Sequence, residues 1–130
     1  MLKNAPVFVT FSVDDLEKAK QFYAETLGLG VDDSMPGMLD VKVAGGGKVM
    51  IYSKKNHQPA NYTVLNFTVD NLAKAMNQLK QKGLKFEQYD LPDIKTDENG
   101  VVDYGMMKIA FFNDPAGNNH AVLQMIEQPK

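Results

Sequence analysis

Residues 110–124 near the carboxyl end have the sequence AFFNDPAGNNHAVLQ. An apolar run enters a tight turn at Asp114, and a second apolar run follows Asn118. Pro115 sets the backbone φ angle of the first corner, and Asp114 can accept hydrogen bonds from amides later in the turn. Gly117 tolerates a positive φ angle at low cost. The stretch predicts a β-hairpin whose second strand presents side chains alternately to two faces.

Composition limits what the chain can do. Its 130 residues are enough to bury a core, so we expect one domain over residues 1–130. There is no cysteine, which excludes disulfides and thiolate chemistry. The net charge is −2 and all 14 basic residues are lysine, so we expect no nucleic-acid partner. No apolar run approaches the ~20 residues of a membrane span and no secretory signal is evident, so we expect a cytoplasmic protein without a membrane partner.

The first half predicts a strand, a helix and a hairpin. Asp14 or Asp15 can cap the helix, and Gly28 stops it. Residues 45–47 are three glycines, which we interpret as a hairpin turn because neither a helix nor a Lys-Ser/Thr ending follows, as a phosphate-binding loop requires. The predicted elements are a strand over 7–13, a helix from Leu16 to about residue 27, a loop over 31–37, and strands over 38–44 and 49–53.

The pattern restarts after a polar linker at about 54–61. Residues 69–75, VDNLAKA, match residues 13–19, VDDLEKA, at a constant offset, which indicates a duplication. We therefore predict an α+β fold of two tandem βαβββ modules with mixed sheets, module one over about 5–55 and module two over about 62–126. The elements predicted for module two are a strand over 62–69, a helix from Leu72 to Gly83, a strand over 84–89, an acidic loop over 90–105, and strands over 106–112 and 118–124.

These motifs resemble the vicinal oxygen chelate superfamily, which includes glyoxalases, bleomycin-resistance proteins and extradiol dioxygenases. The resemblance rests on the two repeated segments, on Phe22-Tyr23 with 27–29, and on the turn over 112–118. It implies paired βαβββ modules folded around a cup, often completed by a homodimer, and we therefore expect a homodimer.

The resemblance also implies where a divalent metal would bind, on the first and last strand of each module. In this chain those positions are Phe8, Val64, Ala121 and either Met50 or Ile51. None of these side chains suits a hard or borderline cation, so we predict no metal and no cofactor. We expect His57 at the surface and His120 on the face away from the cup. The acidic loop lacks EF-hand spacing, and we expect a solvated loop or a mobile lid.

Strand alternation predicts which side chains line the cup. The lining would be apolar and aromatic with a few hydroxyls and one amide, as in a small-molecule pocket. Ala121 and Thr10 are small, which favours an open pocket over a filled one, and Ser12 shares the face of Thr10. The predicted ligand-binding residues are Phe8, Thr10, Met50, Tyr52, Val64, Asn66, Phe111, Ala121 and Leu123.

Three functions are compatible with the sequence. The first is a metal-free protein that binds a small, largely apolar organic molecule, as the drug-binding bleomycin-resistance proteins do. The alternative is a glyoxalase- or dioxygenase-type enzyme, with metal ligands elsewhere or with Tyr52, Tyr104 or Lys108 as an acid or base. The third is an interaction module whose apolar sheet face pairs with another subunit. No Ser-His-Asp arrangement and no carboxylate pair is evident.

Overall fold

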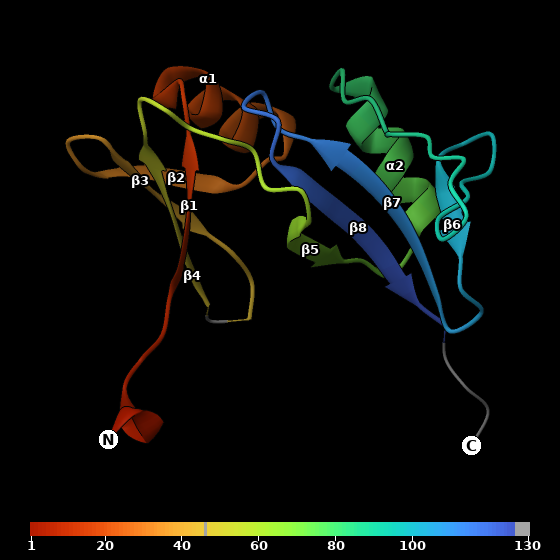
Figure 1. Ribbon diagram of the computed structural model, residues 1–130, viewed down its shortest axis with the longest axis horizontal. Helices are drawn as coiled ribbons and strands as arrows, with labels where there is room; N and C mark the ends of the chain where they lie inside the picture. Colours follow the sequence, from red (N-terminus) through yellow and green to blue (C-terminus); the bar gives the residue numbers. More distant parts are fainter. Residues whose placement is uncertain (46, 127–130) are drawn as a thin grey trace. The chain divides into compact units, whose positions relative to one another are not determined.

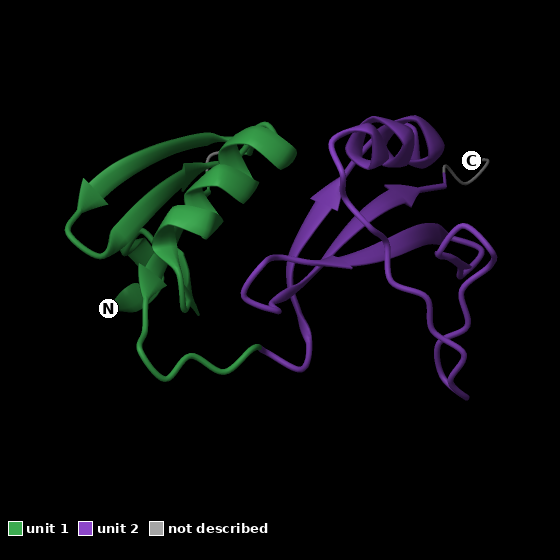
Figure 2. Ribbon diagram, turned by 90° about the horizontal axis from the view of Figure 1, so that it is seen from above, with its two compact units in different colours: residues 1–59 green, residues 60–130 purple. Residues whose placement is uncertain are grey.

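The structure is a computed structural model that describes residues 1–45 and 47–126. The chain divides into two compact units, Met1–Pro59 and Ala60–Lys130 (Figure 2). The division falls inside the predicted linker. Within the described part of the chain, no helix has the length and apolar composition of a membrane span.

Unit 1 is a βαβββ module. After a short 3-10 turn (Leu2–Asn4), its elements are β1 (Val9–Val13), α1 (Leu16–Gln21) with a π-helical turn (Phe22–Thr26), β2 (Gly30–Met35), β3 (Met38–Lys42) and β4 (Lys48–Ser53). The strand order is β1-β4-β3-β2, with β1 parallel to β4 and the other pairs antiparallel (Figure 1). Asp15, not Asp14, caps α1, because its carboxylate accepts a hydrogen bond of 3.1 Å from the Lys18 N–H.

The predicted loop over 31–37 is wrong, because β2 occupies most of it. Val31 pairs with Val41 and Asp32 with Asp40, and only Pro36 and Gly37 remain in the turn. As an edge strand, β2 is mostly exposed and carries charged side chains, so it lacks the apolar alternation that would reveal it in the sequence.

Unit 2 repeats the module. Its elements are β5 (Thr63–Thr68), α2 (Leu72–Gln81), β6 (Val101–Asp103), β7 (Met107–Asn113) and β8 (Asn119–Met125), in the strand order β5-β8-β7-β6. The β5–β8 pair is parallel and the others are antiparallel. Asn71 caps α2 by accepting a hydrogen bond of 3.0 Å from the Lys74 N–H. The two caps occupy equivalent places in the repeat, which confirms the predicted α+β fold of duplicated βαβββ modules with mixed sheets.

The predicted strand over 84–89 is wrong, since β6 takes its place in the sheet. The Glu87 N–H donates to the Phe111 carbonyl at 2.8 Å, but the backbone N–H and C=O of Tyr89 are engaged by Thr96 instead of a strand ladder. The segment between Thr96 and β6 forms a turn around the side chain of Asp97. Its carboxylate accepts hydrogen bonds from the N–H groups of residues 99 and 101 at 2.8 and 2.9 Å. The acidic loop predicted over 90–105 is therefore wrong in part, because it contains a hydrogen-bonded turn around Asp97 and then β6.

In each unit the helix lies over one face of the sheet (Figure 2), and buried apolar side chains pack between the two. In unit 1 the ring centres of Phe11 and Tyr23 are 6.0 Å apart, and Tyr23 is fully buried. In unit 2 the Leu72 N–H donates to the Gln124 side chain at 2.8 Å, so even-numbered residues of β8 face α2. We call the opposite face of each sheet, turned away from its own helix, the far face of that unit.

The closing hairpin is confirmed. The Gly117 N–H donates to the Asp114 carbonyl at 2.9 Å, with Gly117 at φ +86°. The Asp114 carboxylate is buried and accepts hydrogen bonds from the N–H groups of Ala116 and Asn118, at 3.0 and 2.8 Å, and from the Asn118 amide at 3.0 Å. Each role that the sequence suggested for Asp114 and Gly117 is observed.

Candidate functional site

The far face of unit 1 is defined by its strand register. Thr10 pairs with Met50, which pairs with Asp40 on β3; Ser12 pairs with Tyr52, which pairs with Met38. Because Phe11 packs against Tyr23 on the helix side, its strand neighbours Thr10 and Ser12 lie on the far face. Three predicted ligand-binding residues, Thr10, Met50 and Tyr52, therefore share this face. Of the two residues considered for the fourth implied metal position, Met50 lies on the far face and Ile51 on the helix side.

This face is more polar than the sequence predicted. Asp40, half-buried, stands in the same row as Thr10 and Met50. Phe8, half-exposed, precedes β1, and the Lys48 ammonium lies 5.6 Å from the centre of its ring. The sequence-based prediction missed Asp40 because it placed no residue of β3 on the cup face. It missed Lys48 because it began the last strand of the module at residue 49.

A serine–histidine contact is the feature that the sequence did not reveal. The Ser12 hydroxyl oxygen lies 2.6 Å from His57 Nδ1, although 45 residues separate them. The linker is turned back along β1 at this point, because the Lys54 N–H donates to the Val13 carbonyl at 2.9 Å and the His57 N–H to the Lys54 carbonyl at 3.1 Å. His57 is consequently half-buried beside the far face, and its expected position at the open surface is corrected.

In unit 2, three predicted residues lie side by side across the sheet. Ala121 on β8 pairs with Asn66 on β5 and with Phe111 on β7, and Leu123 follows on the same face. Val64 falls at an irregularity in the register, since Thr63 pairs with Asn119 and residue 65 with residue 120. The Thr63 hydroxyl donates to the Asn119 side chain at 3.0 Å, so Thr63 takes the place beside β8 that was predicted for Val64.

The far face of unit 2 is partly covered by its own chain. Phe111, Ala121 and Leu123 belong to a buried apolar cluster with Val102 and Ile109, against which Tyr89, Ile94 and Met107 pack. The ring of Tyr89 lies edge-on to Phe111, with 5.6 Å between the ring centres. The segment that carries Tyr89 and Ile94 therefore forms a wall over this part of the sheet, and Ala121 is fully buried.

The hydroxyl of Tyr89 extends this wall into a polar contact. The Asn119 amide donates to it at 3.4 Å. Burial raises the pKa of the Tyr89 hydroxyl and the charge of Glu87 adds to the shift, while the Asn119 hydrogen bond opposes it. Tyr89 therefore stays protonated at neutral pH and acts as a hydrogen-bonding group.

His120 lies on the α2 side, as predicted. It is fully buried, its Nδ1 accepts a hydrogen bond of 3.3 Å from the Leu65 N–H, and its Nε2 is 3.8 Å from the Asp114 carboxylate. Two residues considered as an acid or base are also poorly placed for that role. Lys108 lies three residues from Phe111 on β7 and so points to the α2 side of the sheet, and Tyr104 is 51% exposed.

The donor set at the four positions implied for a metal does not fit one. Phe8, Val64 and Ala121 have no ligating atom, and Met50 offers only a thioether. Within residues 1–45 and 47–126, no group of three or more histidine, aspartate or glutamate side chains is arranged to hold a metal ion.

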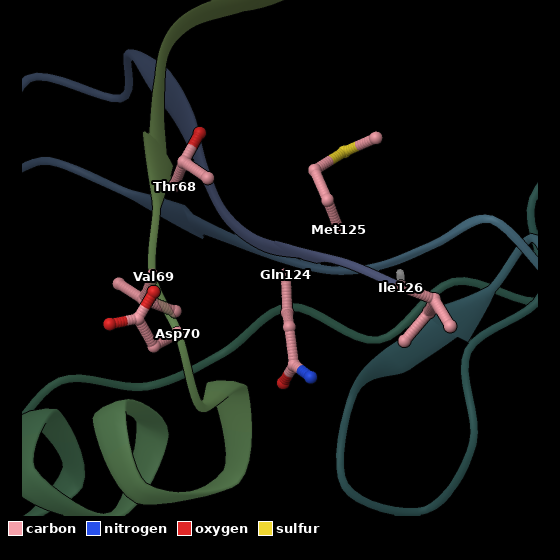
Figure 3. Close-up of a pocket in the computed structure, with 6 residues that line it drawn as sticks. All are labelled: Thr68, Val69, Asp70, Gln124, Met125 and Ile126. Atoms are coloured by element: carbon pink, nitrogen blue, oxygen red, sulfur yellow. The ribbon is translucent and has the colours of Figure 1, made fainter. Parts of the chain in front are cut away.

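A pocket of about 490 Å³ lies elsewhere, at the ends of β5 and β8 beside the start of α2 (Figure 3). Thr68 and Met125 extend to one side of the strands, and Gln124 and Ile126 extend to the other. The pocket therefore wraps around the strand ends, and none of the nine predicted residues lines it. The remaining lining residues are Val69 and Asp70.

Comparisons with known proteins agree with this architecture. Residues 6–122 match the model of the Glyoxalase/Bleomycin resistance protein/Dioxygenase superfamily. A glyoxalase family protein from Bacillus anthracis has a TM-score of 0.73 at 18% identity, covering 95% of this chain and 96% of that chain. TnmS3, an antibiotic-binding protein from Streptomyces sp. CB03234, has a TM-score of 0.70 at 22% identity, covering 97% and 100%. The sequence matches no curated protein.

Proposed function

Since the chain belongs to the glyoxalase/bleomycin resistance protein/dioxygenase superfamily, we propose that it is a metal-free member that binds a small, largely apolar organic molecule. The observation that carries the proposal is the side-chain chemistry at the implied metal positions, which are apolar in both units. With no ligating set there, the far faces offer apolar area for affinity and a few polar groups for orientation.

Two further observations support binding. Met50 and Phe111 place a thioether and an aromatic ring, both nearly buried, on the far faces, and Thr10 and Asn66 are exposed in the same rows of the two sheets. TnmS3, which has the same fold, is an antibiotic-binding protein, and we extend that kind of role to this chain.

We expect 2-methoxynaphthalene, an uncharged aromatic probe, to bind saturably with a Kd below about 1 mM in a fluorescence titration. Thr10→Glu places a charge beside Met50 on the far face of unit 1, so it should weaken binding at least about tenfold. The matched control is Gln21→Glu, which adds the same charge at an exposed position of α1 and should leave binding unchanged.

The same titration is repeated with zinc, nickel, cobalt or iron(II) present, and each metal is titrated alone by calorimetry. Unchanged probe affinity and no stoichiometric metal binding are the expected results. Tight binding of one metal per chain would refute the metal-free proposal, and the absence of saturable probe binding would refute the binding role.

We further propose that the protein is a cytoplasmic homodimer. The homodimer is supported by β1 and the residues before it, because β1 is an edge strand and Leu2, Val7 and Val9 are 84%, 82% and 51% exposed. An exposed strand edge with apolar side chains favours pairing with a second chain. Light scattering at micromolar concentration should give twice the mass of 14.4 kDa, and the monomer mass would contradict the proposal.

A further inference from the structure

We infer that the Tyr89 hydroxyl is a specificity-determining hydrogen-bond donor on the far face of unit 2, and that it recognises the carbonyl oxygen of an uncharged aromatic carbonyl compound. The inference rests on the proposed function, because it names the class of molecule that this face would take. Its basis is a chain of side-chain hydrogen bonds that begins at Glu87 and ends at Tyr89.

The chain of hydrogen bonds has one direction, and Glu87 sets it. The Asn113 amide donates to the Glu87 carboxylate at 2.9 Å, and a carboxylate only accepts. The side-chain carbonyl of Asn113 is therefore the end that accepts, at 3.2 Å, from the Asn119 amide. The same amide donates to the Tyr89 hydroxyl oxygen at 3.4 Å, while the Asn119 side-chain carbonyl accepts from the Thr63 hydroxyl at 3.0 Å. Both N–H bonds of the Asn119 amide are thus assigned, and Tyr89 is the acceptor at this contact.

The Tyr89 hydroxyl consequently keeps its own hydrogen for another partner. Burial and the nearby charge of Glu87 raise the pKa of this hydroxyl, so the hydrogen is present at neutral pH. Among residues 1–45 and 47–126, no group accepts a hydrogen bond from it. An acceptor on a bound molecule is the complement that this hydroxyl lacks.

The position of the hydroxyl is fixed before a ligand binds. The Tyr89 ring packs against the buried cluster of unit 2 and lies edge-on to Phe111, with 5.6 Å between the ring centres. The Tyr89 N–H donates to the Thr96 hydroxyl at 2.9 Å, and the Thr96 N–H donates to the Tyr89 carbonyl at 2.9 Å. A donor held by its ring and by its backbone loses little freedom on binding, which favours affinity.

The surroundings of the hydroxyl indicate the rest of the molecule. Asn119 lies two residues before Ala121 on β8, so Tyr89 reaches the row next to Ala121 and Asn66. Tyr89 is half-buried and Asn66 is exposed, so this part of the face is accessible to a small molecule. The Tyr89 ring favours an aromatic body. An anionic acceptor is disfavoured because Glu87 is close enough to act on the hydroxyl, whereas a carbonyl oxygen accepts without a charge.

The test compares 2-acetylnaphthalene with 2-isopropenylnaphthalene, in which a CH2 group replaces the carbonyl oxygen with little change of shape. Each Kd is measured by equilibrium dialysis, and the selectivity is the Kd of the hydrocarbon divided by that of the ketone. Tyr89→Phe removes the hydroxyl and keeps the ring, so it should lower the selectivity about fivefold and leave the affinity for the hydrocarbon within about twofold. The matched control is Tyr104→Phe, which removes a hydroxyl from a residue that is 51% exposed and should leave the selectivity unchanged.

Glu87→Gln tests whether Glu87 sets the direction of the chain. An amide donates as well as accepts, so Asn113 and Asn119 could then reverse, and the Asn119 carbonyl would take the Tyr89 hydrogen. The selectivity should fall at least about twofold while the affinity for the hydrocarbon stays unchanged. Glu98→Gln, the same change at an exposed glutamate, should leave the selectivity as in the wild type. A Glu87→Gln variant with wild-type selectivity would overturn the positioning role of Glu87.

A second measurement observes the hydrogen bond directly. In the complex with the wild-type protein, the infrared carbonyl stretch of 13C-labelled 2-acetylnaphthalene should lie at lower frequency than in an apolar solvent, and Tyr89→Phe should remove this shift. Unchanged selectivity in Tyr89→Phe, or a bound carbonyl without the shift, would overturn this inference and leave the proposed function intact. Failure of both compounds and of 2-methoxynaphthalene to bind would overturn both.

Discussion

Replacing Phe112 with alanine is expected to lower the free energy of unfolding of unit 2 by about 3–5 kcal/mol, the usual cost of emptying a buried aromatic site. Phe112 is fully buried at the centre of an aromatic group on the α2 side. Its ring centre lies 6.4 Å from that of Phe67, 6.2 Å from that of Phe86 and 5.6 Å from that of His120. Alanine would leave three facing rings without their common neighbour.

The measurement is urea denaturation combined with hydrogen exchange of the β7 and β8 amides, which reports on unit 2 locally. Phe8→Ala is the matched control, since the same substitution is made at a residue that is 52% exposed, and it should cost less than about 1 kcal/mol. Similar losses for both variants would show that Phe112 does not organise this core.

Replacing Asp114 with alanine is expected to cost about 3 kcal/mol, because it removes the acceptor for three hydrogen bonds in a buried turn. The N–H groups of Ala116 and Asn118 would lose their carboxylate acceptor. The side-chain amide of Asn118, a residue only 2% exposed, would lose the same acceptor. The loss should appear as a lower urea midpoint and faster exchange in the β7–β8 hairpin.

Two variants sharpen this result. Asp114→Asn keeps an acceptor for the two backbone N–H groups, so it should cost less than the alanine change. Asp93→Ala removes an exposed carboxylate of the acidic segment and should change stability by less than about 0.5 kcal/mol. If Asp114→Ala were as mild as Asp93→Ala, the turn would not depend on this carboxylate.

The features that the sequence predicted well are local. The sequence narrowed each helix cap to two neighbouring residues, of which Asp15 and Asn71 bond to the third residue beyond them, and Asp114 bonds within five residues of its own turn. Such contacts are specified by residue type and short spacing, so a repeated motif is enough to find them. One failure was also local in origin, since residues 84–89 have strand-like composition but Thr96 takes the backbone hydrogen bonds of Tyr89.

For the candidate site, alternation along each strand was sufficient to group Thr10 with Ser12 and Ala121 with Leu123. It did not fix which strands are neighbours. Pairing decided that Asp40 stands beside Met50, and an irregular register placed Thr63 where Val64 was expected. The cover over Ala121 by Tyr89 and Ile94 also depends on a segment that sequence periodicity does not describe.

The sequence by itself therefore determined the duplicated βαβββ order, the closing turn and the apolar residues at the implied metal positions, and it narrowed each helix cap to two residues. The tertiary structure alone decided the strand partners outside the predicted hairpins, the cover over unit 2 by Tyr89 and Ile94, and the contact of Ser12 with His57. The physical reason is range. Capping and turn bonds close within a few residues, whereas strand neighbours and the Ser12–His57 contact join segments up to tens of residues apart, and their pairing depends on burial across the whole unit.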